Sequence, residues 1–531
     1  MSMKPQILTI PYVGISMMCM ACFLPPVRLY MDALYLPKCH LLLAGLSVCL
    51  LSFPFAARIC GMRTSLYMCM RCFMVSYSIM ALFECLFVFF DVIFNGRGGI
   101  GCRGTFDNPS GLALSLCVAL PMTAMLGKVW HCKGIMQICA VACGCMALTV
   151  ALTESRTGVV CCVVYAFVFV THKLRIAIKG KAVRCMTIVV AAAALLVCAL
   201  LFVFSKKSDS TSGRYFILQQ TCRLVEEHPL TGWGKYGFER EYMLRQADFF
   251  HHNPQSEYSA LADDLKHPLN EYMYLWVEYG IAAPIILLLV IVLTVWNGMR
   301  NDCVRQTGLP LALLALAVFC LFSYPFHYQS SWLVSIMSLA SVLMFLPVRK
   351  STVWYKTMKC ACAYAAFLVG LITACYLATD SFHEMEWRKA YVESVRRNDG
   401  EALEKYESVS GYFDDDWHFH YSYSLAAFMA SDMEKALVEI EECMHYCNGY
   451  DIQLLAGDIC LNMQRYDESV AHYVVAADMC PARFAPLEGL YRAYDELNMI
   501  ENRDSVARMI AEKQVKVYSP DVERIRRLGL Y

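Results

Sequence analysis

Long apolar runs dominate the chain from its amino terminus to about residue 379, and short polar segments separate them. A bilayer core about 30 Å thick is crossed by roughly 17–25 apolar residues of helix, which is the length of most of these runs. Eleven candidate spans lie near residues 7–27, 40–57, 72–94, 110–127, 134–153, 158–172, 185–204, 272–296, 309–325, 331–348 and 360–379. The pattern therefore predicts an all-α fold, a polytopic bundle of about eleven membrane helices.

Lysine and arginine are concentrated in alternate connections between these spans. The densest connection, "HKLRIAIKGKAVR" at residues 172–184, carries five of them, whereas "YPFHYQS" at 324–330 carries none. Basic loops stay on the cytoplasmic side of a membrane. With the amino terminus inside and eleven spans, we expect residues 152–158, the polar segment 205–271 and everything after Ala378 on the outer face.

Composition argues against a nucleic-acid partner and against a metal or cofactor. The chain has 531 residues, is 58% hydrophobic and has a formal net charge of zero, so no electrostatic argument favours a nucleic-acid partner. Most of the 28 cysteines lie inside apolar runs, where cysteine behaves as a small buried hydrophobe. His251 and His252 have no partner ligands at metal spacing. We therefore expect neither a metal nor a cofactor.

The carboxy-terminal 150 residues change character, with lower apolar content and an amphipathic helical period. Small residues recur in similar surroundings at Ala402, Ala436, Ser469 and Ser505, with spacings of 34, 33 and 36 residues. A period near 34 is typical of tetratricopeptide repeats, in which a small residue lets two helices of a hairpin pack closely. The sequence predicts a membrane domain at 1–379, which includes the 205–271 loop, and a repeat domain at 380–531. A generic helical hairpin domain is the alternative.

Two arginines stand out at the polar ends of predicted spans. Arg156 follows an apolar helix in "LTESRTG", and its planar guanidinium group suits the bidentate binding of phosphate oxygens. The simpler interpretation is an arginine that anchors the helix end at the membrane surface. Arg214 follows a glycine at the start of the polar segment and carries little information by itself.

The rest of the polar segment holds candidates for glycan contact. Trp233, in "HPLTGWG", is suited to stacking on a sugar ring or to packing at the membrane surface. Tyr242 and Gln246 are four residues apart on a predicted helix and share a face, from which they would bind glycan hydroxyl groups or support the fold. Asn270 and Glu271 begin the eighth predicted span.

These motifs, in this order and on one predicted side of the membrane, resemble the O-antigen ligase / Wzy polymerase superfamily, which includes bacterial protein O-oligosaccharyltransferases. The resemblance covers roughly residues 100–350. It implies an inverting, metal-independent glycosyltransferase of the GT-C type in the bacterial inner membrane. Its donor would be an undecaprenyl-pyrophosphate-linked glycan, and its polar segment would face the periplasm. It also implies that Arg156 and Arg214 bind the pyrophosphate.

The expected catalytic base is displaced in this chain. Many family members carry a histidine directly before the asparagine that corresponds to Asn270, but this chain has Leu269 at that position. His267 lies two residues earlier and is the candidate base, because an imidazole pKa near 6.5 suits proton transfer from an acceptor hydroxyl. A surface histidine is the alternative. Asn270 and Glu271 match the family pattern.

The acceptor is left open by the sequence. Lipid A-core sugar would make the protein a ligase, a growing glycan would make it a polymerase, and serine or threonine would make it a protein oligosaccharyltransferase. The repeats favour a protein acceptor or partner, because such arrays commonly bind peptides. A lipid-glycan transporter is a weaker alternative, since the chain shows no internal repeat of membrane halves. An assembly scaffold would not need eleven spans.

Overall fold

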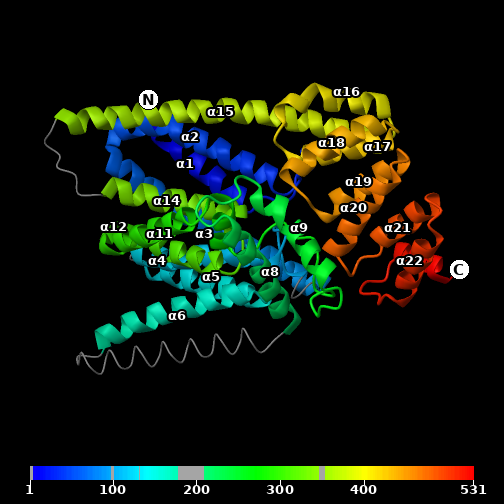
Figure 1. The fold of residues 1–531 in the computed structure, drawn as a ribbon. Coiled ribbons are helices and arrows are strands. Elements are labelled where there is room, and N and C mark those ends of the chain that lie inside the picture. Colours follow the sequence, from blue (N-terminus) through cyan, green and yellow to red (C-terminus); the bar gives the residue numbers. More distant parts are fainter. Residues whose placement is uncertain (1–3, 97–100, 131, 178–207, 346–352, 531) are drawn as a thin grey trace. The chain divides into compact units, whose positions relative to one another are not determined.

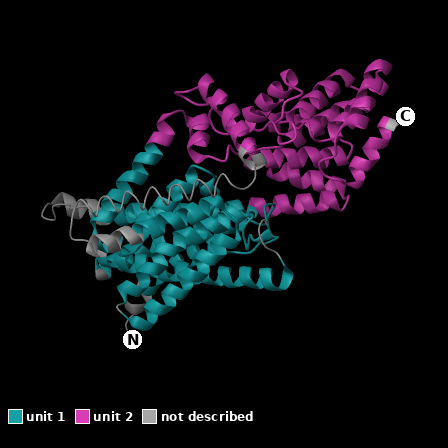
Figure 2. Cartoon of the chain, turned by 90° about the horizontal axis from the view of Figure 1, so that it is seen from below, with its two compact units in different colours: residues 1–206, 286–382 teal, residues 207–285, 383–531 magenta. Residues whose placement is uncertain are grey.

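The computed structural model describes residues 4–96, 101–130, 132–177, 208–345 and 353–530. The chain divides into two compact units, which Figure 2 shows in different colours. Unit 1 comprises residues 1–206 and 286–382, and unit 2 comprises residues 207–285 and 383–531. The polar segment therefore belongs with the carboxy-terminal helices and not with the membrane helices that flank it in sequence.

Unit 1 is a bundle of apolar helices (Figure 1). Its helices are α1 (Lys4–Cys22), α2 (Leu36–Cys60), α3 (Met62–Asn95), α4 (Pro109–Val129), α5 (Lys133–Leu152), α6 (Arg156–Ala177), α11 (Ala282–Arg300), α12 (Asp302–Arg305), α13 (Leu309–Cys320), η2 (Pro325–His327), α14 (Gln329–Phe345) and α15 (Val353–Val395). Six helices in the described residues are long and apolar enough to cross a membrane, and three shorter ones are also apolar. Every described element is helical, so the predicted all-α polytopic class is confirmed. The predicted span at 185–204 lies outside the described residues.

Helix α4 lies at the centre of this bundle and contacts α3, α5, α6, α13 and α14. Leu112 and Leu114 are both fully buried although they lie on opposite sides of the helix. A helix that is apolar on all sides belongs in the interior of a bundle. Its start is fixed by Asn108, whose side chain accepts a hydrogen bond of 2.9 Å from the backbone N–H of Gly111.

The eighth predicted span, near 272–296, is interrupted in the structure. Helix α10 (Glu271–Tyr279) ends at Gly280, whose φ of +72° is a conformation that favours glycine, and α11 begins two residues later. The apolar run continues across this break, which is why hydropathy alone joins the two helices. The membrane helix begins at Ala282 rather than near residue 272.

The predicted loop at 205–271 is largely helical. It contains α8 (Ser208–Glu227) and α9 (Gly237–His252), which share a hydrophobic core with α10 and the carboxy-terminal helices. Phe238 and Met243 of α9 are fully buried beside Tyr450 and Met479. Residues separated by more than 200 positions in sequence thus form one core.

The carboxy-terminal helices form a series of hairpins, coloured yellow to red in Figure 1. After the end of α15 they are α16 (Asp399–Val409), η3 (Ser410–Tyr412), α17 (Trp417–Met429), α18 (Met433–Tyr446), α19 (Tyr450–Asn462), α20 (Tyr466–Met479), α21 (Ala485–Glu496), α22 (Ile500–Glu512), α23 (Pro520–Arg526) and η4 (Arg527–Leu530). The turns inside four successive hairpins carry a left-handed residue at Arg397, Ser431, Gln464 and Asn498. These turns recur every 33 or 34 residues.

The small residues of the predicted repeat occupy equivalent places in three of the hairpins. Ala402, Ala436 and Ser469 each lie five residues after the left-handed turn residue, and all three are buried. In the fourth hairpin the equivalent position is Arg503, whereas Ser505 is exposed. The predicted fourth position was therefore shifted by two residues.

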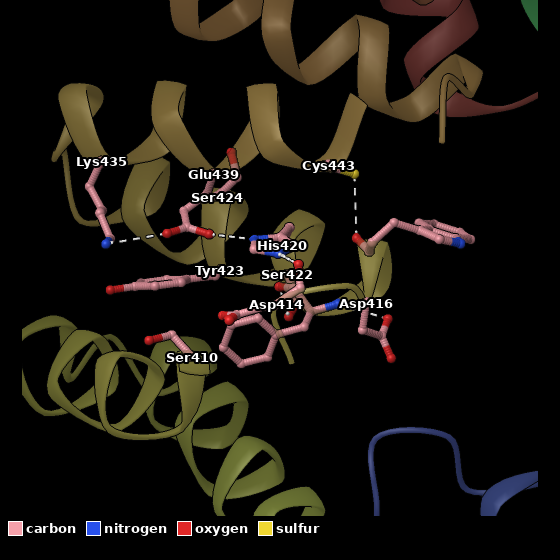
Figure 3. Close-up of polar contacts among 12 residues, drawn as sticks. Ser410, Asp414, Asp416, His420, Ser422, Tyr423, Ser424, Lys435, Glu439 and Cys443 are labelled. Carbon is pink, nitrogen blue, oxygen red and sulfur yellow. Dashed lines mark hydrogen bonds and ion pairs between the residues drawn. The ribbon is translucent and has the colours of Figure 1, made fainter. Parts of the chain in front are cut away.

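A buried polar cluster joins α17 to α18 (Figure 3). His420 Nδ1 lies 2.8 Å from Glu439 Oε2, and the other ring nitrogen lies 3.1 Å from the carbonyl oxygen of Asp414. Lys435 Nζ lies 3.2 Å from the second oxygen of Glu439. Burial alone would lower the pKa of His420, but its bonds to Glu439 and Asp414 raise that pKa above its ordinary value. The cluster satisfies buried charges inside one hairpin.

The left-handed turns generate a stability prediction. Ser431→Gly should stabilise the protein by about 0.5 kcal/mol, because an L-residue is strained at its φ of +63° and glycine is not. Ser505→Gly, at an exposed position in the middle of α22, should destabilise by about 0.5–1 kcal/mol, because glycine weakens a helix interior. Thermal unfolding of the detergent-purified full chain measures both changes. Equal losses of stability in the two variants would contradict the strain at Ser431.

Candidate active site

The segment "SRTG" forms the first turn of helix α6. Ser155 precedes the helix, and its hydroxyl accepts a hydrogen bond of 3.2 Å from the backbone N–H of Gly158. Gly158 allows close packing, because a Cβ at this position would lie 2.9 Å from Val150 and 3.0 Å from Ala113. Arg156 is the first residue of α6 and is half-buried. A guanidinium group at a helix amino terminus combines two features that attract anions.

Arg214 has a different setting from the one expected. It lies within helix α8 rather than in a loop, and it is exposed. Phe216, two residues later, is buried and stacks on Tyr258 with ring centroids 5.0 Å apart. Phe216 therefore anchors α8 in unit 2. Arg156 and Arg214 belong to different units.

The segment 228–234 pairs through its backbone with the end of α10. The N–H of Trp233 donates to the carbonyl of Val277 at 2.7 Å, and the N–H of Gly234 donates to that of Glu278 at 2.9 Å. Gly280 makes this approach possible, since a Cβ there would overlap the carbonyl of Leu230. The segment "HPLTGWG" and the end of α10 thus form one structural feature.

The side chain of Trp233 makes its contacts within unit 2. Its indole N–H donates to the carbonyl of Leu224 at 3.0 Å, and its ring meets the edge of His228 with centroids 4.3 Å apart. The side chain is half-buried and packs against the core of unit 2. Trp233 therefore stabilises the conformation of the segment 228–234 in this structure.

Glu278 holds the beginning of α9. Its two carboxylate oxygens accept hydrogen bonds from the backbone N–H groups of Tyr236 at 2.9 Å and Phe238 at 3.1 Å. The side chain is 1% exposed, and this burial raises the pKa of Glu278 to about 7. Glu278 was not predicted as a functional residue, because a glutamate near the end of an apolar run gives no sign of its distant partners.

Tyr242 and Gln246 share one face of α9, as their spacing predicts, and that face is buried. Tyr242 stacks on Phe238 and is fully buried. The Gln246 amide donates to the carbonyl of Met479 at 2.7 Å. Asn448 adds a further link, since its backbone N–H donates to the carbonyl of Glu239 at 3.1 Å. In this conformation both predicted residues hold α9 against the carboxy-terminal helices.

His267 lies in a tight turn before α10. Its Nδ1 accepts a hydrogen bond of 3.2 Å from the backbone N–H of Leu269, whose φ is +55°. A neutral imidazole with Nδ1 as acceptor carries its proton on Nε2, and that atom lies 3.9 Å from a carboxylate oxygen of Glu271. The lone pair that a general base would use is therefore engaged by the backbone. Asn270 caps α10 by accepting from the N–H of Met273 at 3.0 Å.

A second polar cluster, which the sequence analysis did not assign, lies in unit 1. The Asn108 amide donates to the hydroxyl groups of Tyr324 at 2.8 Å and Tyr328 at 2.7 Å. The Tyr328 hydroxyl donates to the carboxylate of Asp107 at 3.0 Å. The sequence signal was available, because "FDNPSG" and "YPFHYQS" both place polar and aromatic residues in short connections between apolar helices. Within the described residues, no group of three or more His, Cys, Asp or Glu side chains is arranged to hold a metal ion.

Residues 141–288 match the family model described as O-Antigen ligase, Wzy_C. The match includes Arg156, Arg214 and all of the paired segments 228–234 and 277–281. It confirms the resemblance to the O-antigen ligase superfamily for this part of the chain. A comparison with curated proteins found no match. Together with the apolar helices, the family match identifies a multi-pass, O-antigen ligase-like membrane enzyme.

The buried Glu278 generates a pH prediction. Its ordinary pKa of 4.5 rises to about 7 in the folded state, so between these values the folded protein holds a proton that the unfolded chain has released. Stability should therefore fall as the pH rises through this window and level off above it. Glu278→Gln should flatten that part of the profile, because the amide side chain does not titrate.

The measurement is thermal unfolding of the purified full chain at pH 5, 6, 7 and 8. Glu226→Gln, at an exposed position on α8, is the matched control and should leave the profile of the parent unchanged. A Glu278→Gln protein with the same slope as the parent would show that another group controls stability in this window.

Proposed function

We propose that the protein transfers a glycan from an undecaprenyl-pyrophosphate donor to an acceptor at the outer face of a bacterial inner membrane. The observation that carries this proposal is the family match at residues 141–288, which covers Arg156 and the paired motifs in one continuous stretch. The apolar helices of unit 1 agree with a lipid-linked donor. The reaction is inverting in this proposal and uses no metal.

Arg156 has the clearest chemical role. In the reaction an acceptor oxygen attacks the anomeric carbon, and the bond from that carbon to the pyrophosphate oxygen breaks. The electron pair of the broken bond stays on the pyrophosphate, whose negative charge increases. A guanidinium group and the amino-terminal N–H groups of α6 are suited to stabilise this charge without reorganising.

Arg214 is proposed as a second phosphate ligand on the strength of the resemblance. The residue lies at an exposed position on α8. The packing of Phe216 against Phe249, Phe250 and Tyr258 fixes the helix on which it stands. Because Arg214 belongs to unit 2, its role is best tested separately from that of Arg156.

The repeated hairpins are proposed to be tetratricopeptide-type repeats. Their turn spacing of 33 or 34 residues and three buried small residues support this. Their role is proposed to be internal, because Met479 and Asn448 of the hairpin region bind α9 directly. This arrangement weakens the argument that the repeats favour a protein acceptor.

The orientation is proposed to be amino terminus inside and carboxy terminus in the periplasm, on the alternation of basic loops. A reporter that is active only in the cytoplasm, fused after Tyr531, should therefore remain silent. The same reporter fused within the basic segment 172–184 should be active. Strong activity of the carboxy-terminal fusion would reverse the topology and with it the proposed periplasmic reaction.

The arginines generate the test of function. Arg156→Ala and Arg214→Ala should each abolish glycan transfer, and the lysine variants should retain partial activity, because lysine keeps the charge but loses the bidentate geometry. Surface glycans and glycoproteins of a deletion strain complemented with each variant provide the measurement. Arg508→Ala, at an exposed position on α22, is the control. Normal transfer by a well-expressed Arg156→Ala protein would remove this residue from the site, and unchanged glycans in the deletion strain would refute the function.

A further inference from the structure

Three segments far apart in sequence meet at one end of unit 1. They are the start of α2, the residues before α4, and the connection between α13 and α14 that contains η2. Tyr35 stacks on His327 with ring centroids 4.7 Å apart and planes at 17°. Tyr324 and Tyr328 stack on each other with centroids 6.1 Å apart, and Asn108 binds both of their hydroxyl groups. We refer to Tyr35, Asp107, Tyr324, His327 and Tyr328 as the aromatic–carboxylate cluster.

Buried charges fix the position of Asp107 in this cluster. Lys38 is 3% exposed and donates to the carbonyl of Thr105 at 2.8 Å. Glu84 is 4% exposed and accepts from the N–H of the same residue at 2.7 Å. Lys38 and Glu84 thus fix the carbonyl and the N–H of Thr105, and Asp107 follows two residues later. Burying these two charged side chains has a desolvation cost, and their hydrogen bonds order the backbone that leads to Asp107.

His327 is the most exposed member of the cluster. Tyr35, Asp107 and Tyr324 are half-buried, and Tyr328 is 5% exposed. Tyr35 supports one face of its ring, and Asp32 holds Tyr35 by accepting from the backbone N–H of that residue at 2.7 Å. Tyr324 contributes an edge contact with centroids 5.7 Å apart. The imidazole is therefore presented in a fixed orientation.

The cluster lies at the same end of α4 as Arg156. A Cβ on Gly111 would lie 2.5 Å from the ring of Tyr328, so α4 and Tyr328 are in close contact in its first turn. A Cβ on Gly158 would lie 3.0 Å from Ala113 in the next turn of α4, so the start of α6 packs closely against the same end of α4. Arg156 lies two residues before that glycine. All of these residues belong to unit 1.

We propose that His327 is the general base of the transfer reaction and that the aromatic–carboxylate cluster binds a sugar hydroxyl acceptor. This inference rests on the proposed function and names its acceptor class. Aromatic rings pack against sugar rings, and a carboxylate accepts hydrogen bonds from sugar hydroxyl groups. A peptide hydroxyl does not require such a platform.

The step balances without any further reactant. The acceptor hydroxyl gives its proton to His327 as its oxygen forms a bond to the anomeric carbon of the donor. The bond between that carbon and the pyrophosphate oxygen breaks, and the electron pair leaves with the pyrophosphate. The imidazolium then returns its proton to solvent.

The electrostatic surroundings agree with a base. The side chains packed around His327 partly desolvate its ring, and this lowers its pKa below the ordinary 6.5; the carboxylates of Asp107 and Asp32 oppose this shift, and the charge of Lys38 adds to it. The tyrosines that contact the ring, Tyr35, Tyr324 and Tyr328, have pKa values above the ordinary value and stay neutral. His327 is therefore neutral at pH 7. His267, in contrast, has its Nδ1 engaged by the N–H of Leu269.

The test compares three histidine variants of the full-length protein with a lipid-pyrophosphate glycan as donor and a sugar acceptor. His327→Gln should lower kcat by about 10²-fold or more, and the loss of rate at acid pH that the parent shows should disappear. His267→Gln should retain that acid dependence. His445→Gln, at an exposed position on α18, is the control and should match the parent.

Two further variants separate a base from a structural residue. Asp107→Asn should move the acid limb of the rate profile to lower pH, because a carboxylate that raises the pKa of His327 is removed. Tyr35→Ala should raise KM for the sugar acceptor more than KM for the donor. A purely structural role of His327 would give neither change.

The experiment distinguishes failure of the His327 inference from failure of the proposed function. Parental transfer rates and an unchanged pH profile in His327→Gln would overturn the inference and leave the function standing. Loss of the acid limb in His267→Gln alone would assign the base to that residue instead. A parent protein that glycosylates a serine peptide and no sugar would overturn the acceptor class. A parent that transfers nothing from the lipid-pyrophosphate donor would overturn the function itself.

Discussion

The backbone pairing between residues 233–234 and 277–278 determines how the chain is arranged between the end of α8 and the start of α11. Two short hydrogen bonds join the chain before α9 to the chain at the end of α10. Gly280 is needed for the approach, and Glu278 extends the same contact to the first N–H groups of α9. The pairing fixes the chain just before α9 and at the end of α10, shortly before α11 begins. A substitution that breaks this pairing would disturb both of these segments.

Much of the fold could be predicted from the sequence, because membrane spans are specified by local composition. A run of about 20 apolar residues has few alternatives to a membrane helix, whichever helices surround it. The interruption at Gly280 could not be predicted in this way, since the residues on both sides are apolar. The spacing of the hairpins was recognised from small residues. Its fourth position was misplaced because Arg503, which is long and charged, occupies the place of a small residue.

The candidate site was less accessible to sequence reasoning, because its contacts join residues that are distant in the chain. The helical spacing of Tyr242 and Gln246 correctly places them on one face, but only the partners at residues 448–480 show that this face is buried. His267 was selected by its distance from Asn270 in sequence, and its hydrogen bond to Leu269 depends on a backbone conformation that no motif specifies. His327 lies in a short connection without a recognised motif. Its neighbours Tyr35 and Asp107 come from two other segments.

The shared core of α9 and the carboxy-terminal hairpins has a consequence for biosynthesis. A ribosome adds about 5–20 residues per second, so roughly 240 residues of further synthesis separate Phe238 from its partners near Met479 by about 12–48 seconds. During that interval α9 can pack against α8 and α10, but the part of its apolar face that contacts Tyr450 and Met479 has no partner. The core around α9 therefore cannot be completed until most of the chain exists. A chain that ends before residue 480 would leave part of the apolar face of α9 uncovered, so the carboxy-terminal hairpins are needed to finish a core that begins in the family-matched region.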